Sequence, residues 1–170
     1  FKMAFLKYMK GAIVGNEEPK FEVLSKTDDY ELRSYTECRW VTLSIHDKTP
    51  EEFSRDEFKR LFDYINGKNE TGISIEMTIP MVYHILNLLY LKLAPREIYV
   101  RTFGGMAKDA DWKREFDALK AKLENPDDVD LSEYHRAAYD PPFKPFNRRN
   151  EVWVVKKTSS VVEEPQSPTD

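Results

Sequence analysis

The chain has 170 residues, of which 41% are hydrophobic and 13% aromatic, a size and composition typical of one domain with a single core. Acidic and basic residues nearly cancel, leaving a formal net charge of −4, so no overall positive field exists to hold a nucleic-acid backbone. Cys38 is the only cysteine, which excludes an internal disulfide and a thiolate-rich zinc site and favours a reducing, cytoplasmic compartment.

The ends of the chain differ in composition from its middle. The opening residues, FKMAFLKYMKGAIVG, are expected to form a short packing helix. Residues 158–170 contain prolines and several small or acidic residues and are predicted to be a disordered tail, which leaves residues 1–157 as one domain. The longest apolar stretch, 79–91, is shorter than the ~20 residues that a membrane-spanning helix needs. No transmembrane segment is therefore expected.

Short segments rich in β-branched and aromatic residues, each bounded by turn residues, predict strands. The clearest alternation runs from Ile73 to Ile79, where apolar and polar residues take turns, and it predicts a strand with one buried and one solvent-exposed face. In chain order the predicted strands are 21–26, 30–35, 40–45, 73–80, 97–103, 134–140 and 151–157.

Two segments have the apolar spacing of amphipathic helices. The first begins at a capping box, with Thr49 as N-cap and Glu52 at N3, and ends before Gly67. The second begins near Asp109 and stops before Pro126. The apolar stripes are Phe58, Leu61, Phe62 and Ile65 in the first helix, and Trp112, Phe116, Leu119 and Leu123 in the second.

A weak internal repeat relates the two halves of the chain. Shifting the sequence by 58 residues lays 40–65 over 98–123, so that Phe58 meets Phe116 and Ile65 meets Leu123. The pattern predicts an α+β fold in which a strand–helix–strand unit is duplicated about a pseudo-twofold axis.

Several longer motifs also occur in a fixed order: EEPKFEVL, YELRSY, MTIPM, YVRTFGG and YDPPFKPFNRRNEVWVV. On these motifs the chain resembles the SOUL haem-binding protein family, over roughly residues 21–157. The resemblance implies a distorted antiparallel β-barrel flanked by two helices. This chain departs from the family around residues 81–97, where it is atypically short, and a barrel with an uncovered, association-prone edge at 85–93 is therefore expected.

The resemblance further implies a site for haem or protoporphyrin between the first helix and the loop before the last strand. Such a ligand is a flat apolar ring with two carboxylates, so its site needs apolar walls and cations at the mouth. Arg55 and Lys144 would be the propionate partners, although solvated surface charge explains them equally well. The walls would be Phe58, Phe62, Phe143 and Phe146, the first two of which ordinary core packing explains better.

Histidine is the usual protein ligand of haem iron, and the chain has His46, His84 and His135. Some members of the family have a histidine in the strand that corresponds to residues 30–35, where this chain has Ser34. We therefore expect weakly ligated or unligated iron. His84 is the outside candidate because its neighbours in the sequence are apolar.

The sequence contains no convincing catalytic set. Cys38 has no matched histidine and asparagine, and Ser44 near His46 has no third member of a triad. The arginines Arg148 and Arg149 are explained by an anion site or, equally well, by salt bridges at a strand edge. The prediction is a monomeric, non-enzymatic protein that buffers or carries haem or a porphyrin.

Two alternatives stay open. Some relatives in the family are linked to cell death through a short amphipathic motif after the second helix, which would make the chain a protein-interaction module. The corresponding stretch here, 119–135, is interrupted by Pro126 and lacks the expected spacing. A broader small-molecule sensor rests on fold analogy alone.

Overall fold

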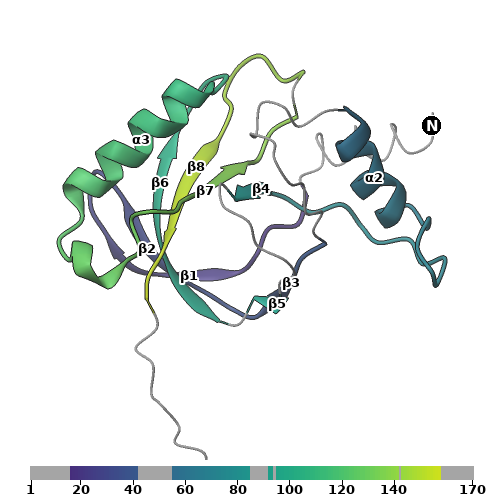
Figure 1. The fold of residues 1–170 in the computed structure, drawn as a ribbon, viewed down its shortest axis with the longest axis horizontal. Helices are drawn as coiled ribbons and strands as arrows, with labels where there is room; N and C mark the ends of the chain where they lie inside the picture. Colours follow the sequence, from purple (N-terminus) through teal and green to yellow (C-terminus); the bar gives the residue numbers. More distant parts are fainter. Residues whose placement is uncertain (1–15, 42–54, 85–91, 94, 142, 158–170) are drawn as a thin grey trace, which may run out of the picture.

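The computed structural model describes residues 16–41, 55–84, 92–93, 95–141 and 143–157 (Figure 1). The chain forms the α+β fold that the sequence predicts, with an antiparallel sheet and two α-helices. Its elements are β1 (Phe21–Lys26), β2 (Glu31–Tyr35), β3 (Cys38–Arg39), α2 (Arg55–Ile65), β4 (Met81–His84), β5 (Lys92–Leu93), β6 (Arg96–Phe103), α3 (Asp109–Lys122), the 3-10 helix η2 (Pro126–Asp128), β7 (His135–Ala138) and β8 (Asn150–Val155).

The main sheet has six antiparallel strands in the order β1-β2-β6-β8-β7-β4, and β3 pairs separately with β5. The central strands β6 and β8 are the most buried, and their sequences, REIYVRTF and NEVWVV, are rich in the β-branched and aromatic residues that fit a covered sheet. Figure 1 shows α3 along one side of this sheet and α2 on the other side of the molecule.

The predicted closed barrel is not found among the described residues. Strands β1 and β4 form the two ends of an open sheet. One parallel bridge joins Glu17 to Thr78, where the Ile79 amide donates to the Glu17 carbonyl at 3.0 Å. This bridge links the segments that precede the two end strands, but a ladder does not continue from it. The edge expected at 85–93 lies almost entirely outside the described residues.

The prediction of helix α3 is confirmed. The helix begins at Asp109, ends at Lys122, and buries Trp112, Phe116 and Leu119 on one face. These side chains pack with Val152 and Val154 of β8 into one core cluster. Burial of this stripe, at roughly 25 cal/mol per Å² of apolar surface, fixes the helix on the sheet.

Helix α2 ends where the sequence predicts. The Asn66 amide donates to the Phe62 carbonyl, and Gly67 takes a left-handed conformation with φ of 93°. Only glycine adopts such a turn without strain, which explains why the helix stops there. The predicted capping box at Thr49 and Glu52 lies outside the described residues, as do the opening helix and the tail.

The predicted strand at 73–80 is wrong. Ile73 is 61% exposed and Ile75 42% exposed, although their alternation indicated a buried face. The segment makes isolated bridges at Ser74 and Thr78 but has no partner strand along its length. Strand propensity depends on a neighbouring strand and a face to bury, and the described residues supply neither to this segment. The chain instead pairs slightly later, as β4, which the sequence did not indicate.

The internal repeat is consistent with the structure only at its helices. Ile65, the last residue of α2, corresponds to Leu123, which directly follows α3. The first copy of the repeated strand, 40–45, lies mostly outside the described residues. The duplicated unit therefore stays a prediction.

Candidate functional site

A buried carboxylate organises the face of the sheet opposite α3. Along β8 the side chains alternate, so Val152 and Val154 face α3 while Trp153 packs with Tyr35 in a second cluster. Glu151 shares the Trp153 face and is fully buried. An ionised carboxylate in such a place is costly unless every oxygen is bonded.

Four side chains closely surround the Glu151 carboxylate, and the Thr102 hydroxyl donates to it from farther away, at 3.5 Å. The Glu151 Oε1 accepts from Nη1 of Arg33 and from Nε of Arg149, both at 3.1 Å, and the Arg149 Nη2 forms an ion pair with the same oxygen at 3.0 Å. Its Oε2 accepts from the Tyr139 hydroxyl at 2.6 Å and from Nε1 of Trp153 at 2.8 Å. Short charge-assisted bonds of this kind compensate the cost of burial.

Burial and the charge of Glu151 shift the pKa values of the ionisable side chains around it. Burial lowers the pKa of the Arg33 guanidinium, but the Glu151 charge and the Tyr35 hydroxyl outweigh it and raise the pKa overall. Burial, followed by the Glu151 charge, raises the pKa of Tyr139. Burial also raises the pKa of Tyr35 to about 12. Arg33 therefore stays charged and both tyrosines stay neutral at physiological pH, with the Tyr139 hydroxyl donating to Glu151 and the Tyr35 hydroxyl accepting from Arg33.

Arg149 connects this buried centre to the β7–β8 loop, residues 139–149. Its guanidinium lies 3.7 Å from the centroid of the Tyr139 ring and also pairs with Glu18 at 3.0 Å. Its backbone amide donates to Oδ2 of Asp140 at 2.6 Å. The other Asp140 oxygen accepts from the Lys144 ammonium at 2.5 Å. The proposed propionate partner Lys144 is thus held by a chain of contacts that begins in the core.

Arg148 holds the same loop together through hydrogen bonds to its backbone carbonyls. Its Nη1 donates to the carbonyls of Pro141 and Lys144, at 2.7 and 3.0 Å, and its Nη2 donates to the Asp140 carbonyl at 3.1 Å. Two large apolar side chains of the loop are nevertheless exposed to solvent. Phe143 is 50% exposed and Phe146 is 78% exposed.

The helix half of the predicted site is only partly described. Arg55 is the first residue of α2, and its side chain lies outside the described part of the structure. Phe58 and Phe62 are half-buried and stack with their ring centroids 5.7 Å apart. Neither is a fully buried core residue. That α2 and the β7–β8 loop hold one ligand together stays a prediction.

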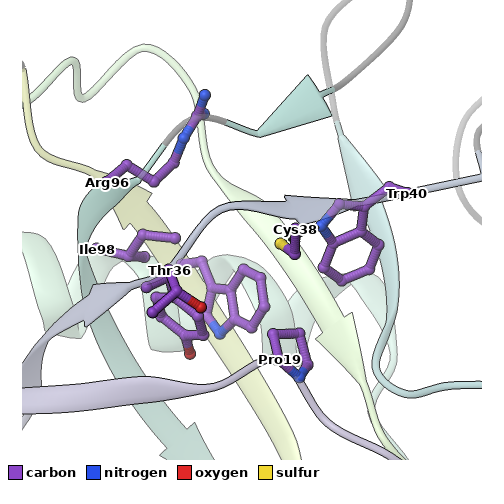
Figure 2. A pocket seen from close by; sticks show the side chains of 8 residues that line it. Pro19, Thr36, Cys38, Trp40, Arg96 and Ile98 are labelled. Atoms are coloured by element: carbon purple, nitrogen blue, oxygen red, sulfur yellow. Dashed lines mark hydrogen bonds between the residues drawn. The ribbon is translucent and has the colours of Figure 1, made fainter.

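The pocket drawn in Figure 2 cannot hold a tetrapyrrole. It lies on the Trp153 face of the sheet, where Nε1 of Trp40 donates to Sγ of Cys38 at 3.1 Å. Its volume is about 10 Å³, room for a single water molecule. The lining residues are Pro19, Tyr35, Thr36, Cys38, Trp40, Arg96, Ile98 and Trp153.

A wider groove of about 340 Å³ lies between α3 and β7, lined by Asp109, Ala110, Lys113, Phe116, Tyr134 and Arg136. Its volume is at the lower end of the range for small-molecule sites. Both of its cations are engaged, Arg136 with Asp109 and Lys113 with Asp117. An anionic ligand would have to displace these carboxylates.

The histidine candidates find little support. His46 lies outside the described residues, and His84 of β4 is the register partner of His135 of β7, with only its backbone described. In the described part of the chain no three His, Cys, Asp or Glu residues are grouped to hold a metal ion. Within the same residues, no helix has the length and apolar character to cross a membrane.

The stretch at 119–135 does not form an exposed amphipathic motif. Helix α3 ends at Lys122 and the chain turns through η2 at Pro126. The apolar side chains Leu119, Leu123 and Val129 are all buried in the α3 core cluster. They are therefore engaged within the domain, which weakens the interaction-module alternative.

Sequence reasoning missed the buried carboxylate. Glu151 stands alone in the apolar run EVWVV, and a lone acid between residues that fill a central strand is the signal that could have identified it. Of the two explanations for Arg149, salt bridging is the one observed, whereas Arg148 binds carbonyl oxygens.

Comparisons with known proteins agree with the motifs. The model of the family described as "SOUL heme-binding protein" matches residues 16–91 and 86–155. "Heme-binding protein 1" of Sus scrofa is 29% identical over 187 aligned residues, which cover 89% of this chain and 99% of that protein. "Heme-binding protein 2" of Homo sapiens is 26% identical over 166 residues, covering 79% and 81%.

The same comparisons bear on the length of the middle segment. The family match is divided in two, and the parts meet at 86–91. The 187 aligned residues also exceed the 170 residues of this chain, so the relative has positions without a counterpart here. The shortening around 81–97 stays a prediction, with both observations in its favour.

Replacing the buried acid tests the role of the polar centre. In Glu151→Gln the charge that compensates Arg33 and Arg149 is lost, and we expect the free energy of unfolding to fall by about 3–5 kcal/mol in equilibrium urea titrations. Glu97→Gln, which removes the exposed partner of Lys156, is the matched control and should cost less than about 1 kcal/mol. Equal losses in the two variants would contradict the assigned role.

The contacts that hold the β7–β8 loop predict a lowered pKa for the Asp140 carboxyl. Burial raises the pKa of Asp140, but the Lys144 hydrogen bond and the Arg149 amide outweigh it, so the pKa lies below 3.8. The stabilisation is therefore present above pH 3.8 and is lost as the pH falls through the lowered pKa. An NMR titration of the Asp140 carboxyl should show a midpoint below 3.8, moving upwards in Lys144→Ala and unchanged in Lys156→Ala. A midpoint at or above 3.8 in the unsubstituted protein would contradict the ion pair.

Proposed function

The chain belongs to the SOUL heme-binding protein family, and on this premise we propose that it binds haem or iron-free protoporphyrin without catalysing a reaction. The relatives' printed names, "Heme-binding protein 1" and "Heme-binding protein 2", support this ligand class. The observation in this structure that carries the proposal is the braced β7–β8 loop with two exposed phenylalanines.

The exposed rings fit the ligand because they are apolar and preorganised. Large apolar side chains on a loop normally collapse onto the protein, whereas Phe143 and Phe146 stay exposed on a loop that Arg148 ties at three carbonyls. A preorganised loop loses little entropy when it covers a flat ring. Phe58 and Phe62 of α2 would supply the opposite wall.

The cations fit the ligand's carboxylates. A bound tetrapyrrole supplies a flat apolar ring and two propionates, and haem adds its iron. The Lys144 side chain is 39% exposed, so its ammonium could turn from Asp140 towards a propionate, while Asp140 would keep the hydrogen bond from the Arg149 amide. Arg55 would bind the second propionate from the start of α2.

The proposed site is an open apolar face instead of a closed cavity. The enclosed pocket of about 10 Å³ is too small for the ring. We therefore expect contacts to the ring and propionates to carry the affinity, with the iron weakly ligated or unligated and His84 as the outside candidate. Exchangeable binding of this kind suits a cytoplasmic, monomeric buffer or carrier.

Neutralising the two cations tests the site. The double variant Arg55→Ala/Lys144→Ala should weaken haemin binding by about tenfold, since two charge-assisted contacts are lost at a partly exposed site. Affinity is measured by titration with haemin and with protoporphyrin, following Soret absorbance and tryptophan quenching. The two ligands should bind the unsubstituted protein with similar affinity, one per chain.

The matched control is Lys26→Ala/Lys113→Ala, which removes two exposed cations that are also paired with carboxylates, Glu31 and Asp117. It should leave the affinity unchanged. If folded, unsubstituted protein saturates with neither ligand, the proposal fails. If the two double variants lose affinity equally, the site is misplaced.

A further inference from the structure

The side chain of Lys144 is free to turn although its backbone is held. The Lys144 amide donates to the Pro141 carbonyl at 3.0 Å, and the Lys144 carbonyl accepts from Nη1 of Arg148 at 3.0 Å. Its ammonium, at the end of a flexible and partly exposed side chain, lies 2.5 Å from Oδ1 of Asp140. A change of partner by this lysine therefore needs only rotations within its own side chain.

Asp140 is the fixed member of this ion pair. Its side chain is 13% exposed, and its Oδ2 accepts from the Arg149 amide at 2.6 Å. Its backbone carbonyl accepts from Nη2 of Arg148 at 3.1 Å. The two carboxylate oxygens thus have different roles, because Oδ2 holds the backbone of the loop and Oδ1 holds the ammonium. If the lysine turns away, the carboxylate stays in place.

The Asp140 carboxylate also stays compensated when the lysine turns away. Burial raises the pKa of Asp140, but the hydrogen bonds from Lys144 and the Arg149 amide, with the charges of Lys144 and Arg148, lower it overall. Of these contributions, the Arg149 amide and the Arg148 charge do not depend on Lys144. The ion pair can therefore open without leaving the carboxylate unsupported.

We infer that Asp140 competes with the ligand's propionate for Lys144 and so limits the affinity of the site for ligands that carry a carboxylate. Asp140 offers the ammonium the same chemical group as a propionate does, so each binding event breaks this ion pair and each release forms it again. The inference rests on the proposed function, in which Lys144 binds a propionate. Its new element is an acidic residue at the site whose charge opposes binding.

The shape of the loop does not depend on this ion pair. Hydrogen bonds that leave out the Lys144 side chain hold the backbone, namely those from the Arg148 guanidinium to three carbonyls and that from the Arg149 amide to Asp140. A partly exposed ion pair contributes little to stability. Loss of the Asp140 charge should therefore change the affinity for a carboxylate more than the structure of the loop.

The test is titration with protoporphyrin and with protoporphyrin dimethyl ester, which has the same ring but no carboxylate charge. In Asp140→Asn the side-chain amide oxygen can still accept from the Arg149 amide, whereas the charge that holds Lys144 is gone. We expect protoporphyrin to bind this variant about fivefold more tightly than unsubstituted protein, in keeping with the modest strength of a partly exposed ion pair. The affinity for the ester should not change.

Asp117→Asn is the matched control, because Asp117 also pairs with a lysine four positions away, Lys113, but on α3. It removes the same charge from the protein and should leave the affinity unchanged. In the Lys144→Ala background the gain from Asp140→Asn should shrink, since no ammonium is left to release. An equal gain in the control or in that background would indicate a general charge effect, and an equal gain for the ester would indicate a changed loop. Each of these results would overturn the inference.

A second measurement uses unsubstituted protein and so does not depend on the folding of a variant. The NMR signal of the Asp140 carboxyl carbon should differ between protein saturated with protoporphyrin and protein saturated with the ester, because the ring acts equally in both and only the acid draws Lys144 away. Identical signals would overturn the inference. Protein that binds protoporphyrin but gains nothing from Asp140→Asn refutes only the competition, whereas unsubstituted protein that binds neither ligand refutes the proposed function as well.

Discussion

The buried carboxylate of Glu151 is the constraint that determines which side chains surround it on the face of the sheet opposite α3. A charge in a central strand is tolerable only if donors converge on it from neighbouring elements, and here they come from β2, β8 and the β7–β8 loop. The α3 face is covered mainly by apolar packing, and two arginines of the sheet, Arg101 and Arg136, add ion pairs to Glu115 and Asp109 of the helix. Both faces have a buried apolar cluster, but only the face opposite α3 has a fully buried carboxylate at its centre.

The contacts of Glu151 extend to the protein surface through neighbouring residues of the chain. Arg149 binds Glu151 with its side chain and Asp140 with its backbone, and Asp140 in turn holds Lys144. Arg148 then ties the loop through hydrogen bonds to three of its carbonyls, and Phe143 and Phe146 of that loop are exposed. Under the proposed function, a ligand face made in this way is formed before the ligand binds. It also needs no enclosed cavity, which agrees with the small volume of the pocket in Figure 2.

Sequence reasoning succeeded where one physical signal dominated. The stripe from Trp112 to Leu123 and the glycine at position 67 predicted α3 and the end of α2, because periodic burial and a left-handed turn are local requirements. It failed at Ile73–Ile79, where the alternating segment pairs with no strand among the described residues, and at barrel closure, which depends on pairing between distant segments and is not found in that part of the chain. Of the predicted site, the exposure of Phe143 and Phe146 is observed, whereas the Asp140–Lys144 pair and the Glu151 centre depend on contacts between segments that no local pattern records.

The measurement that tests the central claim most directly is an NMR map of backbone shift changes during titration with iron-free protoporphyrin, which avoids paramagnetic iron. The account predicts saturable changes at one ligand per chain, concentrated in the β7–β8 loop around Phe143 and Phe146 and in α2 around Phe58 and Phe62. Changes centred instead on the groove of Lys113, Phe116 and Tyr134 would contradict the placement of the site. A spectrum that does not change at saturating ligand would contradict tetrapyrrole binding itself.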